Sequence, residues 1–361
     1  MEKRKILVVN TTDMGYSGIS SVIINYFDKT YNDVQYDFVL CGRIEGGCTE
    51  KIKSLGCNIF IPPCSRVRKP LNYYAWLKKL IKSKGYDVIH VHGNSGTMFI
   101  EIHAAQITSV PVRIAHCHST SCKYKWAHYI LKPFLNLELT HAIACSNMAG
   151  KWLFTKKFEV LPNGIDLGRF AFSKELRDEY RKKLGICDKL VIGHVANMNN
   201  EKNHMFLLNV FELLLKERQN VCLLLIGDGE IRSEIEVYIE THQLKNNVYI
   251  LGKRSDVAEL YQCMDIFVLP SLFEGLPVSL VEAQCAGLPC IVSNRVTKQV
   301  NVTKNIVYLG IEDPDKVLWK DTIMDIFDSD TNIDRAGSVD ILRMSEFSID
   351  RNLDKLLNIY N

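Results

Sequence analysis

The feature that most constrains the fold is the regular recurrence of short, β-branched apolar runs, with helical patterns between several of them. Runs of a first series lie at residues 5–10, 36–41, 58–62, 87–93, 112–118 and 141–146. Runs of a second series lie at residues 190–198, 221–229, 247–252, 265–271 and 288–294. Alternating strands and helices build parallel sheets that carry helices on both faces. The two series therefore predict an α/β chain with two doubly wound, Rossmann-like domains.

A break separates the two series at residues 160–170, "VLPNGIDLGRF", where Pro and Gly interrupt the pattern and no strand is complete. We expect a first domain over 1–165 and a second over 166–345, because 361 residues are long for one domain and comfortable for two. The pattern over 72–85 predicts a helix closed by a glycine, and residues 346–361 predict a last helix.

Composition excludes several classes of protein. A net charge of +3 is too small to suggest a nucleic-acid binder, and 47% hydrophobic with 24% charged residues is ordinary for a globular enzyme. The twelve cysteines include no CxxC pair, which favours reduced thiols over a disulfide framework. The apolar run in "MEKRKILVVN" is too short for a signal peptide, and no run approaches the length of a membrane span. These features predict a cytoplasmic protein.

Polar segments follow most of the predicted strands. In open parallel sheets, ligands bind beyond the carboxyl ends of the strands. The segments at those ends are "TTDMGYSGISS", "HVHGNSG" and "HCHSTS" in the first half, and "ANMNNEKNH", "GDGE", "GKRSD" and "PSLFEGLP" in the second. These segments contain most of the His, Asn and Gly residues that have polar neighbours, and an enzyme with a cleft between two domains needs such residues there.

The segment "FEGLPVSLVEAQCAGLP" at residues 273–289 carries two glutamates in an otherwise apolar stretch. Pro277 suits the first turn of a helix, where its missing N–H costs nothing. Glu274 then lies in the loop before the helix, and Gly275 lets the backbone approach a ligand closely. The free N–H groups of the first turn, together with the helix dipole, make a site for a phosphate.

Glu282 falls inside the same helix. At about 100° per residue it shares a side of the helix with Val278 and Val281, where a carboxylate is costly unless it hydrogen-bonds hydroxyl groups. A sugar nucleotide offers a diphosphate for the helix start and sugar hydroxyls for two carboxylates. The alternative is a glutamate at a helix N-terminus plus a surface glutamate, and the pair alone leaves that alternative open.

The spacing of Glu274 and Glu282 resembles the E-x7-E motif of the family 4 glycosyltransferases, which are retaining enzymes of the GT-B fold. The similarity extends along nearly the whole chain. It includes "GYSGIS", "DVIHVHG", "IAHCHSTS", "ACSNMAGKWLF", "LPNGIDLGRF", "EKNH", "LLLIGDGEIR", "LGKRSDVAELYQCMDIFVLPSLFEGLP" and "VEAQCAGLPCIVSN". The nearest similarity is to the branch that assembles bacterial capsular and exopolysaccharide repeat units.

This resemblance implies an architecture and an activity. The GT-B fold has two Rossmann-like domains that face each other across a cleft. The first would bind the acceptor and the second the nucleotide sugar, and the last helix, 346–361, would cross back to pack on the first domain. The expected reaction transfers a hexose, with retention, to a saccharide or polyprenyl-diphosphate-linked acceptor.

The resemblance also implies roles in the second domain. Glu274 would bind the donor hexose near its 3-hydroxyl, and Glu282 would hold the ribose. The backbone of Gly275, Leu276 and Val278 would meet the sugar and the diphosphate.

Further residues match the family one position at a time. Lys202 would neutralise the departing diphosphate, Gly18 would lie against the diphosphate and the acceptor, and His118 would touch the transferred sugar. Gly229 and Glu230 would border the nucleotide. The resemblance also assigns the donor site Lys253 and Arg254, because they follow the strand that contacts the base.

Two positions depart from the family pattern. Asn197 stands where members usually carry an arginine, five residues before Lys202, so one positive charge is missing beside the diphosphate. The paired glycines of the first loop are replaced by Ser17 and Gly18, with the other glycine at Gly15. We expect either compensation by another cation or reduced activity.

The sequence has four histidines close together in two predicted strands, which are enough to form a metal site: His90, His92, His116 and His118. Family members of this kind need no metal, and alternating histidines in strands are more often half-buried polar residues. The expectation is therefore no metal and no cofactor, with a nucleotide sugar as co-substrate and a UDP-hexose as the first guess by family habit.

Basic and aromatic residues are interleaved over 66–84, with no acidic residue among them. A basic helix with aromatics can lie on an anionic membrane surface. A solvated helix with a buried apolar side explains the same pattern, and the sequence leaves both interpretations open.

The inventory of residues suggests the course of the reaction. No carboxylate is clearly placed as a covalent nucleophile, so the resemblance implies that the departing phosphate oxygen takes the acceptor proton at an oxocarbenium-like centre. Two other functions stay open: a sugar-nucleotide epimerase or phosphorylase of the same architecture, and a degenerate partner subunit that binds a nucleotide sugar without turnover. Asn197 supports the degenerate subunit.

Overall fold

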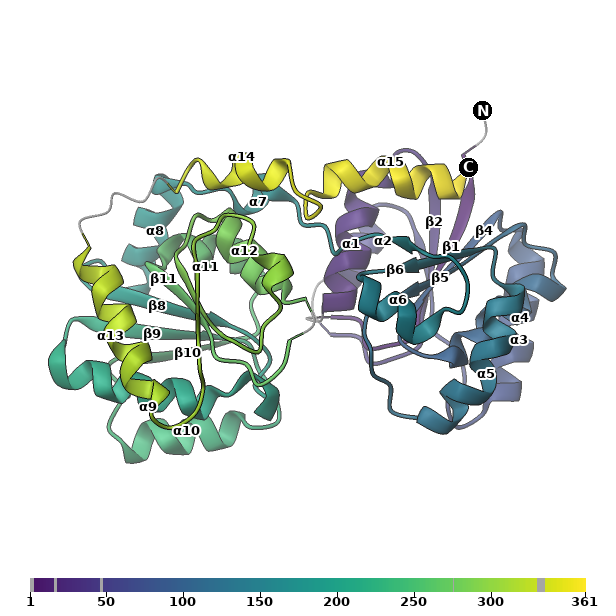
Figure 1. Cartoon of the computed structure of the whole chain (residues 1–361). Coiled ribbons are helices and arrows are strands. Elements are labelled where there is room, and N and C mark those ends of the chain that lie inside the picture. Colours follow the sequence, from purple (N-terminus) through teal and green to yellow (C-terminus); the bar gives the residue numbers. More distant parts are fainter. Residues whose placement is uncertain (1–2, 16–17, 46–47, 275, 330–334) are drawn as a thin grey trace. The chain divides into compact units, whose positions relative to one another are not determined.

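The computed structural model describes residues 3–15, 18–45, 48–274, 276–329 and 335–361, and the chain divides into two compact units. Unit 1 comprises Met1–Gly164 and Ile349–Asn361, and unit 2 comprises Ile165–Ser348. The predicted boundary between residues 165 and 166 lies one residue from this division. The last helix belongs to unit 1, although all of unit 2 lies between it and the rest of unit 1 along the chain (Figure 1).

Unit 1 is built on a parallel sheet in the order β3-β2-β1-β4-β5-β6-β7. Its strands are β1 (Lys5–Asn10), β2 (Gln35–Leu40), β3 (Asn58–Phe60), β4 (Val88–Gly93), β5 (Val112–Cys117), β6 (His141–Ala144) and β7 (Glu159–Val160). The sheet is central, and its strands are buried on both faces because helices cover both.

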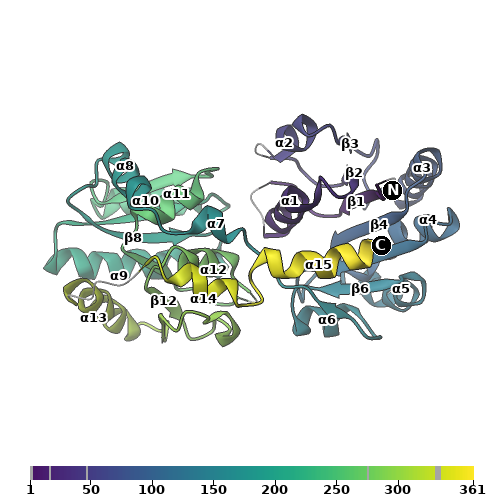
Figure 2. The same ribbon diagram turned by 90° about the horizontal axis from the view of Figure 1, so that it is seen from above.

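Alternate residues of β1 show how the helices are divided between the two faces. Leu7 and Val9 pack in one core with α3 (Pro70–Lys84), α4 (Phe99–Ile107), α5 (Lys125–Glu138) and α6 (Asn147–Leu153). Ile6 and Val8 point to the opposite face, into a core with α1 (Gly18–Thr30), α2 (Cys48–Ser54) and α15 (Ile349–Tyr360). The view in Figure 2 shows α15 lying along unit 1 beside α1.

Unit 2 has a parallel sheet in the order β10-β9-β8-β11-β12-β13. The strands are β8 (Leu190–Val195), β9 (Val221–Ile226), β10 (Val248–Gly252), β11 (Ile266–Leu269), β12 (Cys290–Ser293) and β13 (Ile306–Leu309). One face packs on α9 (His204–Glu217), α10 (Arg232–Thr241) and α13 (Asp315–Asp328). The other packs on α7 (Leu167–Phe170), α8 (Lys174–Leu184), α11 (Val257–Cys263), α12 (Val278–Cys285) and α14 (Ser338–Arg343).

Both sheets are parallel and doubly wound, as the alternation of strands and helices predicts. Two short strands were not predicted. β7 has two residues and lies where the sequence shows no complete strand, and β13 is a four-residue edge strand with only one buried side chain. The helix expected over 72–85 is α3, which ends at Lys84 and is capped by Gly85 with a left-handed φ of 62°.

No helix in the described part of the chain is both long and apolar enough to cross a membrane. The cysteines whose side chains the structure places are free thiols, and most of them are buried in the apolar cores.

Candidate functional site

In unit 2, the loops that follow β8 and β11 meet at the carboxyl edge of the sheet. These two strands are neighbours, so their loops start side by side. The backbone N–H of Leu272 donates to the carbonyl of Glu201 at 2.8 Å, and the amide of Asn203 donates to the carbonyl of Pro270 at 3.2 Å. These bonds fix each loop against the other.

Lys202 and Glu274 form an ion pair across these two loops. Their side chains are only 20% and 11% exposed, and the hydroxyl of the buried Ser271 donates to Oε1 of Glu274 at 3.0 Å. Lys202 ends a short 3-10 turn, η2 (Asn200–Lys202), where the side chain of Asn199 accepts its backbone N–H at 3.2 Å. The pair places one cation and one carboxylate where an anionic, hydroxyl-bearing ligand can engage both.

Glu282 lies inside α12, as predicted, and the phenol of Tyr261 donates to its Oε2 at 3.0 Å. Burial raises the pKa of Glu282 to about 7, against smaller opposing effects from that hydrogen bond and from Arg169. Pro277 is the N-cap residue of α12, one position before the first turn in which the sequence placed it.

The loop after β9 approaches the loop after β8 so closely that only glycine fits. A Cβ on Gly227, whose φ is 136°, would lie 1.9 Å from the carbonyl oxygen of Ala196. A Cβ on Gly229 would lie 2.2 Å from the carbonyl oxygen of Met198. Glu230, the next predicted residue, is exposed. The glycines therefore allow the two loops to pack against each other.

The position of the missing arginine, Asn197, is exposed at this edge. Arg254, a candidate for the missing charge, donates to Asp256 through Nε at 2.7 Å. His204 follows Lys202 closely, but burial and the neighbouring His194 lower its pKa to about 2, so it is neutral at pH 7. Because Arg254 is paired with Asp256 and His204 is neutral, neither residue supplies a second positive charge beside Lys202.

The remaining predicted donor-binding residues of unit 2 are dispersed. Lys253 is exposed in the loop after β10. Leu276 and Val278 are partly buried and pack on the core of unit 2, with their backbone at the start of α12. Gly275 lies outside the described residues.

In unit 1, His118 follows β5, and its backbone and ring are both held. The backbone N–H faces the carbonyl of Gly93 at 3.3 Å and the side-chain oxygen of Asn94 at 3.2 Å. Ring Nε2 lies 2.9 Å from Nδ1 of His92. Burial lowers the pKa of His118 to about 3, so the ring is neutral at pH 7. Gly18, the other predicted residue of this unit, begins α1 and is exposed.

Sequence reasoning missed the residues that hold the site residues in place. Ser271, Tyr261 and Asn94 donate to or accept from predicted residues, yet none stands out in the sequence. Tyr261 is distant from Glu282 along the chain, and only the packing of α11 against α12 brings the two together.

Two family models match the chain: Glycosyltransferase Family 4 over residues 39–169, and Glycosyl transferases group 1 over residues 177–332. EpsF of Bacillus subtilis (strain 168), a protein named as a glycosyltransferase, is 35% identical over 100% of this chain and 97% of its own length. The chain belongs to glycosyltransferase family 4.

Other relatives agree with the capsular branch of family 4. The UDP-Gal:alpha-D-GlcNAc-diphosphoundecaprenol alpha-1,3-galactosyltransferase of Escherichia coli is 28% identical over 77% of this chain and 76% of its own length. The capsular polysaccharide biosynthesis glycosyltransferase CapH of Staphylococcus aureus is 23% identical over 72% of this chain and 74% of its own length.

Solved structures establish the fold of this family 4 chain. Anabaena HepE, crystallised with UDP and glucose, matches with a TM-score of 0.79 and 17% identity over 98% of both chains. The fold is GT-B, with two Rossmann-like α/β domains, as the sequence predicted.

Proposed function

We propose that this family 4 glycosyltransferase is a retaining hexosyltransferase that uses a UDP-sugar donor and a polyprenyl-diphosphate-linked saccharide acceptor. The observation that carries the proposal is the partly buried ion pair of Lys202 and Glu274 at the carboxyl edge of the sheet in unit 2. The diphosphate of the donor would form an ion pair with Lys202, and a hydroxyl of its hexose would donate a hydrogen bond to Glu274. Both charged groups would therefore keep a partner when the donor binds.

The reaction needs charge stabilisation more than a protein nucleophile. Glu274 is committed to Lys202 and Ser271, and Glu282 to Tyr261, so each carboxylate is held by donors and suits hydroxyl binding. The departing phosphate oxygen would then take the acceptor proton, while Lys202 neutralises the developing charge on the diphosphate. His118 is neutral and held at its backbone, so it would contact the transferred sugar without adding charge.

The choice of substrates is supported by relatives whose names state them. The Escherichia coli relative is named for UDP-Gal and for an acceptor on diphosphoundecaprenol, and HepE was crystallised with UDP. A lipid-linked acceptor would require the enzyme to work at a membrane surface.

The structure changes which surface we propose for that contact. Of the apolar residues on α3, Tyr73, Leu77 and Ile81 are buried in the core, which favours the solvated-helix interpretation for 66–84. The outward face of α5 instead exposes large apolar side chains, with Trp126 71% and Leu137 80% exposed.

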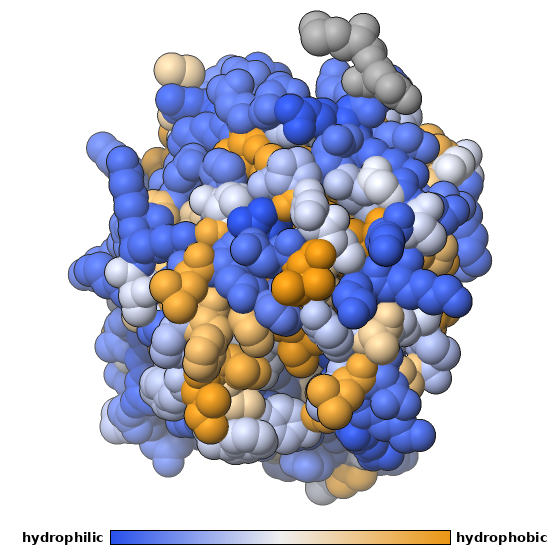
Figure 3. Space-filling view, turned by 90° about the vertical axis from the view of Figure 1, so that its right-hand side faces the viewer, coloured by the Kyte–Doolittle hydropathy of each residue, from blue (hydrophilic) through white to orange (hydrophobic). Residues whose placement is uncertain are grey.

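The exposed residues of α5 lie on one face of the helix. The large apolar ones follow the spacing i, i+3, i+4, i+8 and i+11, which places them in one stripe: Trp126, Tyr129, Ile130, Phe134 and Leu137. Helix α3, which carries exposed lysines, packs on α4, and α4 packs on α5. Figure 3 views unit 1 from its outer side and shows hydrophobic side chains gathered on the lower part, among hydrophilic ones. An apolar stripe near lysines suits an anionic lipid surface.

The proposed activity is tested by turnover. A thermal-shift screen of UDP- and GDP-sugars identifies the donor, and product formation is then measured with synthetic polyprenyl-diphosphate saccharides. NMR of the product gives the anomeric configuration. We expect the configuration of the donor to be kept, and an inverted product would overturn the proposed mechanism.

A second candidate function is a degenerate partner subunit, because Asn197 replaces the arginine that family members usually carry beside the diphosphate. Nucleotide binding without turnover on any donor and acceptor pair would favour it. Conversion of a UDP-sugar in the absence of an acceptor would instead indicate the epimerase.

A further inference from the structure

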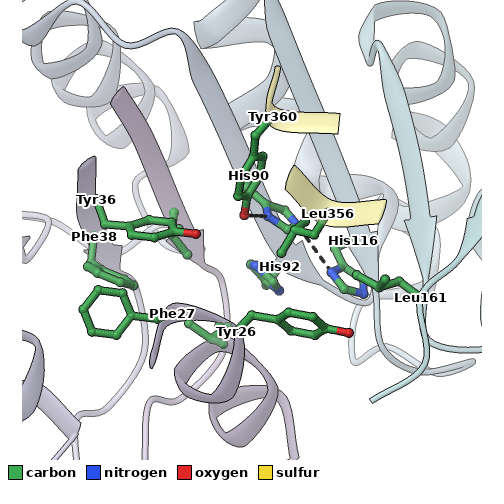
Figure 4. A pocket seen from close by; sticks show the side chains of 12 residues that line it. Tyr26, Phe27, Tyr36, Phe38, His90, His92, His116, Leu161, Leu356 and Tyr360 are labelled. Atoms are coloured by element: carbon green, nitrogen blue, oxygen red, sulfur yellow. Dashed lines mark hydrogen bonds between the residues drawn. The ribbon is translucent and has the colours of Figure 1, made fainter. Parts of the chain in front are cut away.

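Unit 1 encloses a cluster of histidines, of which His90 and His116 have no part in the proposed transfer. His90 and His92 alternate along β4, so both point to the same face of the sheet. His116 lies opposite His92 in the neighbouring strand β5. All three are buried beneath α1 and α15, and Figure 4 shows their rings gathered beneath Tyr360.

A chain of hydrogen-bonded hydroxyl groups determines which ring nitrogen of His90 carries the proton. The hydroxyl of Thr30 donates to the carbonyl of Tyr26 at 2.7 Å, so it must accept from Tyr36 at 2.7 Å. Tyr360 donates in turn to Tyr36. The oxygen of Tyr360 is then left to accept, and Nδ1 of His90 lies 2.8 Å from it. His90 therefore carries its proton on Nδ1, which leaves a lone pair on Nε2.

The lone pair on Nε2 of His90 faces a ring nitrogen of His116. Nε2 of His90 lies 3.3 Å from Nδ1 of His116. Nε2 of His116 is buried, and within the described part of the chain it makes no hydrogen bond. A cavity of about 20 Å³ is lined by His90, His92 and His116, with Tyr26 and Tyr360. This volume holds one water or one small ion.

The three histidines have the spacing of metal ligands. Each offers one ring nitrogen, and the three nitrogens lie within 4.8 Å of one another. An ion bound between Nε2 of His90 and Nδ1 of His116 would replace the proton that these two nitrogens share, and the proton of His116 would move to its Nε2. Their separation of 3.3 Å is about that of two nitrogens on a tetrahedral ion with bonds of roughly 2.0–2.1 Å. We propose that His90, His92 and His116 form a three-histidine site for a borderline divalent metal ion, such as Zn²⁺, Co²⁺ or Ni²⁺.

The environment of the site supports this assignment. All three histidines are buried, and burial favours the neutral imidazole, which is the form that binds a metal. The phenol of Tyr360 accepts from His90, as the outer partner of a metal-ligating histidine commonly does.

The site would hold parts of unit 1 together rather than act in the transfer. It joins β4, β5 and, through Tyr360, the end of α15. No carboxylate is among the residues that line the cavity, so nothing there offsets the charge of the ion, and we expect micromolar rather than nanomolar affinity.

The first experiment titrates the tag-free full chain with Co²⁺ and follows absorption and heat. We expect one equivalent to bind, with the visible bands of nitrogen and oxygen ligands and no thiolate charge-transfer band, and a melting temperature raised by several degrees. A thiolate band would assign the ion to the cysteines. Failure to bind at millimolar Co²⁺ would mean that the cavity holds water only. Either result overturns the proposal.

Variants locate the ion. His116→Gln and His92→Gln should each weaken binding at least tenfold, while His141→Gln, outside the cluster on β6, should leave it unchanged. Tyr360→Phe keeps the three ligands and removes only the outer partner of His90, so binding should weaken roughly 10- to 100-fold. Binding that is unchanged in these cluster variants would overturn the proposal. If a histidine variant fails to fold, the spectrum of the wild type and Tyr360→Phe still decide it.

Discussion

At the residue scale, Lys202 and Glu274 neutralise each other in the loops where the donor is proposed to bind. Glu274→Gln keeps the size of the side chain and removes its charge, which frees Lys202 for the diphosphate. We expect turnover to fall about 100-fold or more, since loss of one transition-state contact costs roughly 3 kcal/mol, while the affinity for UDP stays equal or rises. Steady-state kinetics and calorimetry measure the two quantities.

A matched control for this substitution lies on the same turn. Glu201 is exposed, and only its backbone carbonyl joins the two loops, so Glu201→Gln should leave turnover unchanged. A comparable loss of UDP binding in Glu274→Gln would contradict the assignment of Glu274 to the reacting hexose.

Glu282 predicts a dependence of stability on pH. Its pKa is about 7 in the folded chain against an ordinary value of 4.5, so the folded state binds the extra proton between these values. Stability contributed by the protonated form is therefore lost as pH rises from about 4.5 through 7. Glu282→Gln should be more stable than the wild type at pH 8, by up to about 3 kcal/mol, and equally stable or less so at pH 4.5. Urea unfolding at the two pH values measures this.

The same substitution tests the proposed ribose contact. UDP affinity of the wild type should rise with pH through 7 as Glu282 ionises, whereas that of Glu282→Gln should be weaker at pH 8 and independent of this titration. Unchanged affinity at pH 8 would remove Glu282 from the ribose site.

Asn197 marks the departure of this chain from its family. Because Arg254 is paired with Asp256 and His204 is neutral, Asn197→Arg should supply a second positive charge beside Lys202. We expect turnover to rise about tenfold, the equivalent of 1.4 kcal/mol, with nucleotide binding that becomes more sensitive to salt. Asn197→Gln is the uncharged control. A neutral or harmful arginine would mean that another cation already serves the diphosphate.

At the scale of elements, α5 turns an apolar stripe outward instead of into the core. Replacing Trp126 and Leu137 by Ser should weaken flotation with anionic vesicles about tenfold or more, because both side chains would leave water on binding. The matched control replaces Val317 and Leu318, exposed apolar residues of α13 in unit 2, and should float like the wild type. Equal binding to neutral and anionic vesicles, or no binding, would refute the proposed surface.

At the scale of the whole molecule, the chain leaves unit 1 after Gly164 and returns to it at Ile349. The two crossing segments are joined where the N–H of Ile165 donates to the carbonyl of Phe347 at 3.0 Å. On its return the chain forms α15, which buries one side in the core beneath α1, including Leu356 and Tyr360. The folding of unit 1 thus depends on residues that follow the whole of unit 2 along the chain.

This dependence can be measured in calorimetry. Leu356→Ala should lower the stability of unit 1 by about 2–5 kcal/mol through loss of buried apolar contact, whereas Lys355→Ala, on the exposed side of α15, should have little effect. The melting of unit 2 should stay unchanged in both variants. A shift in unit 2 alone would contradict the division of the chain.

The sequence alone determined much of this protein because strand and helix periodicity is a local property. It predicted both doubly wound sheets, the approximate division of the chain, and the family motif that names Lys202, Glu274 and Glu282. It missed β7 and β13, which are short strands with few buried side chains and so leave little periodic signal.

The tertiary structure decided which side chains meet and which are covered. Tyr261 reaches Glu282, and Lys202 reaches Glu274, only because separate loops and helices converge, and no local pattern encodes those contacts. Likewise, packing buries Tyr73, Leu77 and Ile81 of α3 and leaves the apolar stripe of α5 exposed. The histidines of β4 and β5 form a cluster because parallel pairing sets the two strands in register, which depends on long-range contacts and not on neighbouring residues.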